Sequence, residues 1–300
     1  MHKVIMYFLF MSFCNLLAAQ KHTSKSFPFI LTEYNNISVK SVLNKKDTAQ
    51  LMFHTAANAI TLTEGAIKKL NTVKFTETTD SVKSWGGQAN SARLSKHNQL
   101  KIGGLEWNEL SIWENVNSGQ FTDGKFGIDL FVNQVIEIDF DKSIITISNK
   151  LPAKARNYER LSLIRKDDNL FLQADCKVER MVCSNLFLLH SGYSGSVLLD
   201  DQFVALNYLD EKLAIVGEKT LKDSYGNTIK TKKAILPLFS FGKQVLANVP
   251  VGFFEGAIGR QKMSIIGGDV LKRYNIIISA DRAFIYLKPN KFNQVAYSNK

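Results

Sequence analysis

The stretch that decides the fold is NLFLLHSGYSGSVLLD, residues 185–200. An apolar run at 186–189 ends at His190, and the small polar residues 191–196 separate it from a second apolar run at 197–199. A strand that stops at a turn of small residues and then restarts projects the residues of the turn into a cleft. The pattern predicts a strand–loop–strand unit with one imidazole at the end of its first strand.

A second copy of this pattern lies earlier in the chain, at residues 50–62, QLMFHTAANAITL. Its triplet His54-Thr55-Ala56 corresponds to His190-Ser191-Gly192. Because the same unit occurs twice, an incidental histidine in an ordinary glycine-rich turn explains the pattern poorly.

The correspondence continues downstream, where Phe126-Gly127-Ile128-Asp129 in the first copy matches Ile266-Gly267-Gly268-Asp269 in the second. Asp141 follows Asp129 by 12 positions, and Asp281 follows Asp269 by 12. A repeat of this length is too long for a solenoid. It predicts two similar lobes that each contribute one loop to a shared cleft.

This duplicated pattern resembles the lobes of aspartic peptidases of the pepsin and retropepsin kind. In those lobes a strand, Asp-(Thr/Ser)-Gly and a second strand precede an apolar-apolar-Gly motif and a short helix. The resemblance covers about residues 28–290. It implies an all-β fold with a few short helices, in which two barrel-like lobes are related by approximate two-fold symmetry. The lobes would span 28–150 and 166–290, with a linker at 151–165.

The sequence departs from that family at the two positions on which its chemistry depends. His54 and His190 stand where the resemblance places the catalytic aspartates, while Thr55 and Ser191 keep the supporting hydroxyl group. Ala56 replaces the glycine of the first motif.

The resemblance also implies hairpin flaps over the cleft, and the aromatic–glycine pairs Trp85-Gly86 and Tyr225-Gly226 lie at matching places in the two copies. Ordinary turns with exposed aromatic rings are an equal alternative. Asp129 and Asp269 are expected to cap the short helices that follow the glycines. A role as displaced catalytic carboxylates is the less favoured alternative for these two.

Four interpretations of the histidine pair remain open. Aspartic peptidases depend on two close carboxylates that share one proton, whereas two close imidazoles repel each other when both are charged. We favour a protein that binds an extended peptide without cleaving it. The alternatives are a peptidase or hydrolase that uses the pair as general base and acid, a metal site for which His97 is the candidate third ligand, and a purely structural role.

The N-terminal segment Met1–Ala19 has Lys3, an apolar run at 4–13 and a small-residue end at Ala18-Ala19. This arrangement is typical of a secretory signal peptide and predicts a secreted or periplasmic protein. The segment is short for a membrane span, and no later apolar run is long enough, so we expect no integral membrane span.

Cys176 and Cys183 remain after removal of such a signal, and they fall on a hairpin predicted at 170–189. In an oxidising compartment two cysteines favour a disulfide, which would brace the strand that delivers His190. Two unpaired buried thiols are the alternative.

The formal net charge is +11, but the basic residues are scattered and form no long run of lysine and arginine. This distribution indicates a solvated basic surface and, with the signal peptide, argues against a nucleic-acid partner. We expect a monomer whose partner is a peptide or polypeptide, with no cofactor and no metal.

Overall fold

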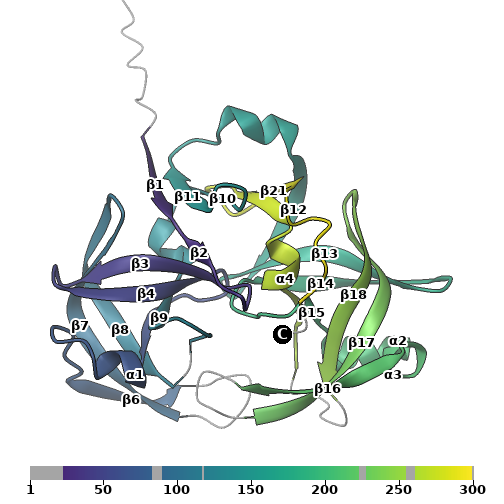
Figure 1. Cartoon of the computed structure of the whole chain (residues 1–300), viewed down its shortest axis with the longest axis horizontal. Helices are drawn as coiled ribbons and strands as arrows, with labels where there is room; N and C mark the ends of the chain where they lie inside the picture. The colour runs from purple at the N-terminus through teal and green to yellow at the C-terminus, as the bar shows by residue number, and fades with distance from the viewer. Residues whose placement is uncertain (1–22, 83–89, 117, 223–227, 255–260, 299–300) are drawn as a thin grey trace, which may run out of the picture.

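The computed structural model describes residues 23–82, 90–116, 118–222, 228–254 and 261–298, and these residues form two β-rich lobes beside a shared central sheet (Figure 1). One eight-stranded sheet belongs to the first half of the chain. In sheet order its strands are β2 (Ile30–Leu31), β3 (Ile37–Leu43), β4 (Asp47–His54), β9 (Gly124–Gly127), β5 (Ile60–Thr63), β8 (Leu105–Asn115), β7 (Asn90–Ile102) and β6 (Glu77–Val82).

The second sheet has 13 strands and contains elements of both halves. In sheet order they are β1 (Ser24–Pro28), β11 (Ile144–Ser148), β10 (Val135–Asp139), β20 (Tyr274–Ile278), β21 (Phe284–Pro289), β12 (Glu159–Lys166), β13 (Asn169–Val178), β14 (Met181–His190), β19 (Ser264–Gly267), β15 (Val197–Leu198), β18 (Gln244–Phe254), β17 (Thr228–Phe241) and β16 (Ile215–Lys222).

Helices in the described ranges are short. They are α1 (Glu64–Ile67), η1 (Ile128–Phe131), η2 (Ala153–Asn157), α2 (Asp201–Asn207), α3 (Leu209–Lys212) and α4 (Gly268–Leu271), where η denotes a 3-10 helix. Among the described residues, no helix combines the length and apolar character needed to cross a bilayer.

The two halves share one local topology around the predicted loops. In the first half β9 runs parallel to β4 and antiparallel to β5. In the second half β19 runs parallel to β14 and antiparallel to β15. The duplication that the sequence predicts is therefore present in the strand pairing, and the all-β, two-lobed prediction is confirmed.

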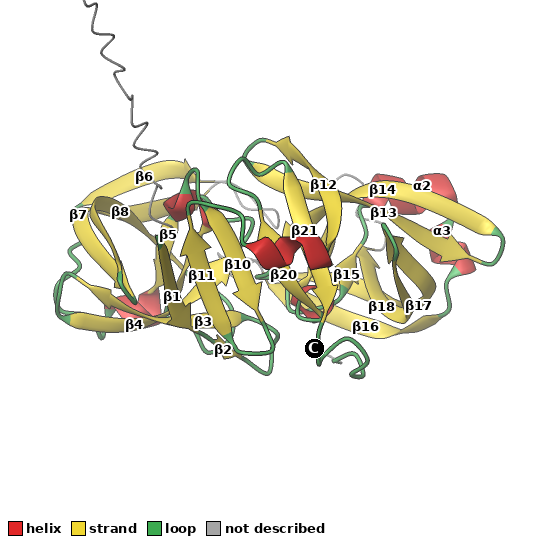
Figure 2. Ribbon diagram, turned by 90° about the horizontal axis from the view of Figure 1, so that it is seen from above, coloured by secondary structure: helices red, strands yellow, loops and turns green. Residues whose placement is uncertain are grey.

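The central sheet joins the halves at their symmetry axis, where β10 pairs antiparallel with β20 (Figure 2). Glu137 faces Ile277 in this pairing, and these two residues are separated by the same 140 positions as Asp129 and Asp269. The axis therefore passes through this pair. The segment 151–165, which the resemblance makes a linker, contains η2 and most of β12, and β12 is itself a strand of the sheet.

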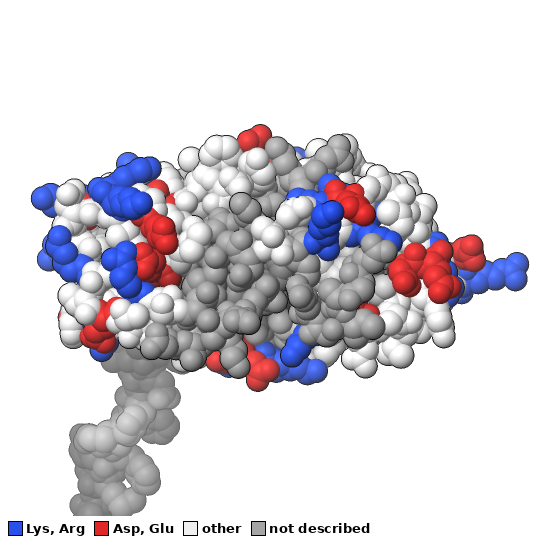
Figure 3. Space-filling view, turned by 90° about the horizontal axis from the view of Figure 1, so that it is seen from below, with Lys and Arg blue, Asp and Glu red and all other residues white. Residues whose placement is uncertain are grey.

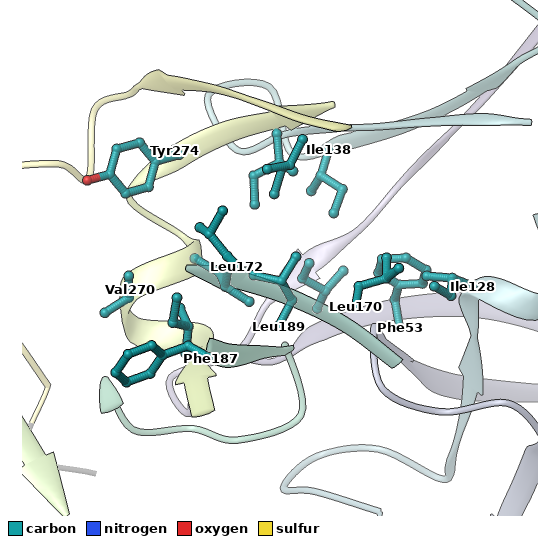
Figure 4. Close-up of a cluster of buried hydrophobic side chains, with 14 of the residues drawn as sticks. Phe53, Ile128, Ile138, Leu170, Leu172, Phe187, Leu189, Val270 and Tyr274 are labelled. Carbon is teal, nitrogen blue, oxygen red and sulfur yellow. The ribbon is translucent and has the colours of Figure 1, made fainter. Parts of the chain in front are cut away.

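Aromatic side chains anchor the strands that lead into the two loops. The Phe53 ring lies 5.5 Å from that of Phe126, and the Phe187 ring lies 5.0 Å from that of Phe239. Figure 4 shows Leu189 between Phe53 and Phe187, so the buried core continues from one lobe into the other. Ring pairs of this kind stabilise a core beyond simple area burial, which fixes where each strand ends.

The cysteine pair differs from the prediction. Cys176 lies directly opposite Cys183 in the β13–β14 hairpin, as expected, but both are free thiols. Both side chains are buried, and burial raises the pKa of both thiols. They pack into the core as small apolar groups, so the expected disulfide is not formed in this structure.

Candidate functional site

The ends of β4 and β14 bring the two predicted histidines together. Each strand ends in a tight turn, in which the Ala57 amide donates to the His54 carbonyl and the Tyr193 amide donates to the His190 carbonyl. The two imidazole ring centroids are 4.4 Å apart, with an angle of 61° between the ring planes. The lobes thus meet at an imidazole pair.

Thr55 and Ser191 exchange hydrogen bonds across the same interface. The Thr55 amide donates to Ser191 Oγ at 3.0 Å, and the Ser191 amide donates to Thr55 Oγ1 at 3.0 Å. The Thr55 hydroxyl donates to the Leu189 carbonyl at 2.6 Å, and the Ser191 hydroxyl donates to the Phe53 carbonyl at 2.8 Å. Each hydroxyl therefore satisfies buried backbone groups of the opposite lobe.

The two histidines are bonded differently. The Ala56 amide donates to His54 Nδ1 at 3.1 Å, so the neutral His54 ring carries its proton on Nε2. His190 Nδ1 is buried and has no hydrogen-bond partner among the described residues. A Cβ at Gly192 would lie 2.3 Å from His54 Cδ2, so glycine leaves the room that the His54 ring occupies.

Burial keeps both imidazoles uncharged at neutral pH. It lowers the pKa of His54 well below its ordinary value, and the nearby charges of His190 and Lys125 lower it further. Burial, followed by Lys125, lowers the pKa of His190 to about 4. Both effects disfavour the charged form, because the interior solvates an imidazolium poorly and a lysine repels it.

Lys125 is the site residue that the sequence interpretation missed. In the parallel pairing of β4 with β9, Met52 faces Lys125 and His54 faces Gly127. Side chains alternate along a strand, so Lys125 lies on the same face as His54, opposite to the core-facing Phe126. Burial lowers the pKa of Lys125.

One signal in the sequence could have revealed it. The repeat places Lys125 two residues before the glycine of the first copy, where the second copy has Ile265. A charge that replaces an apolar residue in one of two otherwise similar strands is a departure from the repeat that the sequence itself displays.

The two aspartates do not cap their helices, so that expectation is wrong. Gly127 and Gly267 occupy the N-cap positions without a side-chain cap bond. Asp269 is fully buried and turns instead to Lys272, whose Nζ is 2.7 Å away, and to the Ser298 amide at 2.7 Å. A carboxylate held in this way is not available to the histidine pair.

His97, the candidate third metal ligand, lies away from the pair. Its side chain on β7 is 76% exposed and sits beside Glu109. In the described part of the chain, no group of three or more histidine, cysteine, aspartate or glutamate side chains could hold a metal ion.

The four predicted flap residues, Trp85, Gly86, Tyr225 and Gly226, lie outside the described residues. The strands that flank them are described. β6 and β7 remain paired up to Val82 and Asn90, and β16 and β17 up to Lys222 and Thr228. Both lobes therefore carry an antiparallel hairpin at the predicted place.

The fold is similar to that of a solved aspartic proteinase from Irpex lacteus. The two structures superpose with a TM-score of 0.61 over 92% of this chain and 100% of that chain, at 12% sequence identity. The sequence matches no protein-family model and no curated protein. The fold is therefore aspartic-proteinase-like, although an identity this low leaves the histidine pair without a counterpart to compare.

We expect Thr55→Val to lower the free energy of unfolding by about 1–3 kcal/mol, because it leaves buried backbone groups of the second lobe without their partner. The double variant Thr55→Val/Ser191→Ala should lose less free energy of unfolding than the sum of the two single losses, because both residues belong to one network. Ser26→Ala is the matched control, because it removes a hydroxyl bonded to Thr146 at 2.8 Å on the surface. Urea unfolding is measured for the wild type, the two single variants, the double variant and Ser26→Ala. A Thr55→Val loss as small as that of Ser26→Ala would contradict the role of the network.

We expect the free energy of unfolding to fall as the pH is lowered from about 6.5 towards 4. Unfolded histidines take up protons near ~6.5, whereas the buried pair resists protonation, so the unfolded state binds more protons in this window. Replacing His190 with asparagine should reduce the fall between pH 7 and pH 5 by about 1–2 kcal/mol. Identical pH profiles for wild type and His190→Asn would show that His190 is not held neutral.

Proposed function

We propose that this protein binds an extended peptide or polypeptide in the cleft between its lobes and does not cleave it as an aspartic peptidase does. The observation that carries the proposal is the imidazole pair of His54 and His190, which stands where the two lobes of an aspartic-proteinase-like fold meet. Extended peptides are held mainly by main-chain hydrogen bonds and by pockets for alternate side chains. Neither requires a carboxylate pair.

The hydrogen bonding of the pair argues against hydrolysis. His54 Nδ1 already accepts the Ala56 amide, so the other ring nitrogen is protonated and cannot act as a base. His190 has a pKa lowered to about 4, so near pH 7 the pair contains no imidazolium to serve as general acid. The chemistry therefore favours binding over the alternative in which the pair acts as general base and acid.

The surface is consistent with a partner that is not a nucleic acid. On the face shown in Figure 3, lysine and arginine side chains lie beside aspartate and glutamate side chains at both ends of the molecule. Nucleic-acid sites instead gather basic residues in one patch or stripe. A peptide or polypeptide partner therefore fits the described surface better.

We expect the protein, incubated with a mixed peptide library, to retain peptides at pH 7 and to cleave none at pH 4–5. The double variant His54→Asp/His190→Asp should gain cleavage at pH 4–5, because two close carboxylates can share one proton there. His97→Asp is the control for adding a carboxylate elsewhere. Mass spectrometry of the library measures both retention and cleavage.

Three results would count against the proposal. A wild type that retains no peptide would contradict binding. Acid cleavage by the wild type that is lost in His54→Ala would establish the alternative hydrolase, and cleavage that survives His54→Ala and His190→Ala would remove the pair from the function altogether.

We also propose that the protein is exported, on the basis of the charged, apolar and small-residue regions of Met1–Ala19. Expression of the full chain in a host with a secretory pathway should yield a mature protein whose N-terminus lies close to Gln20. Mutating Ala18 and Ala19 together to arginine should block this processing. Soluble protein that retains Met1–Ala19 in an intact-mass measurement would contradict export.

A further inference from the structure

Among the described residues, the two lobes differ beside the imidazole pair, where the first lobe has a lysine and the second has an isoleucine. Lys125 lies on β9, the strand beside β4, and on the same face of the sheet as His54. Its direct partner on β4 is Met52, two residues before His54. The corresponding residue of the second lobe is Ile265, opposite Leu188. Lys125 acts electrostatically on both imidazoles and lowers the pKa of each.

The imidazole pair adds hydrogen-bond donors at the same point. His54 presents an N–H on Nε2, because its Nδ1 is occupied by the Ala56 amide. His190 has a buried Nδ1 without a partner in the described residues, so its ring can carry a proton on either nitrogen. The Lys125 ammonium group and one N–H of each neutral imidazole are hydrogen-bond donors, and donors of this kind suit an anion.

We propose that the centre of this cleft receives a carboxylate of the bound peptide, with Lys125 as its ionic partner and His54 and His190 as hydrogen-bond donors. The inference rests on the proposed peptide binding, and it names the class of peptide. Carboxylates are the anionic groups of an unmodified peptide, so the source is either an acidic side chain or the C-terminal carboxylate.

The proposal has a consequence for pH dependence. Titratable or charged groups lie on the elements that carry or follow the two histidine turns: Lys125 on β9, Tyr193 after β14, Asp129 on η1 and Asp269 on α4. Of these, only Lys125 acts on the histidines, apart from their action on each other. A bound carboxylate favours the imidazolium form. Binding therefore takes up protons, and affinity should rise as the pH falls from 7.5 to 5.5, while the carboxylate itself stays ionised.

The experiment uses three pools of octapeptides, all acetylated at the N-terminus, whose variable positions contain neither aspartate nor glutamate. The first has one fixed glutamate and an amidated C-terminus, the second has glutamine at that position and an amidated C-terminus, and the third has glutamine and a free C-terminus. Affinity is measured for wild type, Lys125→Met and the control Lys177→Met, which removes an exposed lysine of β13.

We expect the wild type to bind at least one carboxylate-bearing pool about tenfold more tightly than the amidated glutamine pool, and the pool that binds identifies the source. Lys125→Met should abolish this preference while retaining affinity for the neutral pool, and Lys177→Met should change neither. The preference of the wild type for the carboxylate-bearing pool should also increase as the pH is lowered from 7.5 to 5.5. This measurement uses the wild type alone, so it does not depend on whether a variant folds.

Equal affinity of the wild type for all three pools would overturn the inference and leave the proposed peptide binding intact. A preference that persists in folded Lys125→Met would also overturn it. If no pool binds at either pH, peptide binding itself fails, and the inference fails with it.

Discussion

The exchange of hydrogen bonds between Thr55 and Ser191 sets the spacing of the two lobes at the point where their strands end. Each hydroxyl accepts from the backbone amide of the opposite residue and donates to a carbonyl of the opposite strand. All these groups are buried, so breaking one bond leaves a polar group without water or partner. Because β4 and β14 end immediately before this network, His54 and His190 are held with their ring centroids 4.4 Å apart.

This network consists of hydroxyl and backbone groups, so it does not depend on the residue that each strand presents at its end. An aspartic-proteinase-like scaffold can therefore keep its architecture while the chemistry at its centre changes. Here the two strand ends present imidazoles that burial and Lys125 keep neutral. The proposed binding of a peptide depends on these neutral imidazoles and on Lys125 beside them, and it does not need a group that activates water.

Much of this architecture could be predicted from the sequence, because the repeat gives the strand ends, the loops and their spacing. The pairing of Glu137 with Ile277 on the symmetry axis follows from the same 140-residue interval. The rest depends on side-chain geometry that no periodicity encodes. Cys176 and Cys183 face each other as expected but remain thiols, and Asp269 turns to Lys272 rather than to its own helix terminus. The unequal bonding of the two histidines depends on the Ala56 amide, which bonds His54 Nδ1, while His190 Nδ1 has no partner among the described residues.

The central claim is that His54 and His190 form a neutral imidazole pair, and NMR titration of imidazole nitrogens tests it most directly. Selective ¹⁵N-histidine labelling, with His54→Asn and His190→Asn for assignment, gives the pKa and the tautomer of each ring. The account predicts that both rings are neutral at pH 7, that both pKa values lie well below the ordinary ~6.5, and that His54 carries its proton on Nε2. A pKa at or above 6.5 for either ring, or a His54 ring protonated on Nδ1 at pH 7, would contradict it.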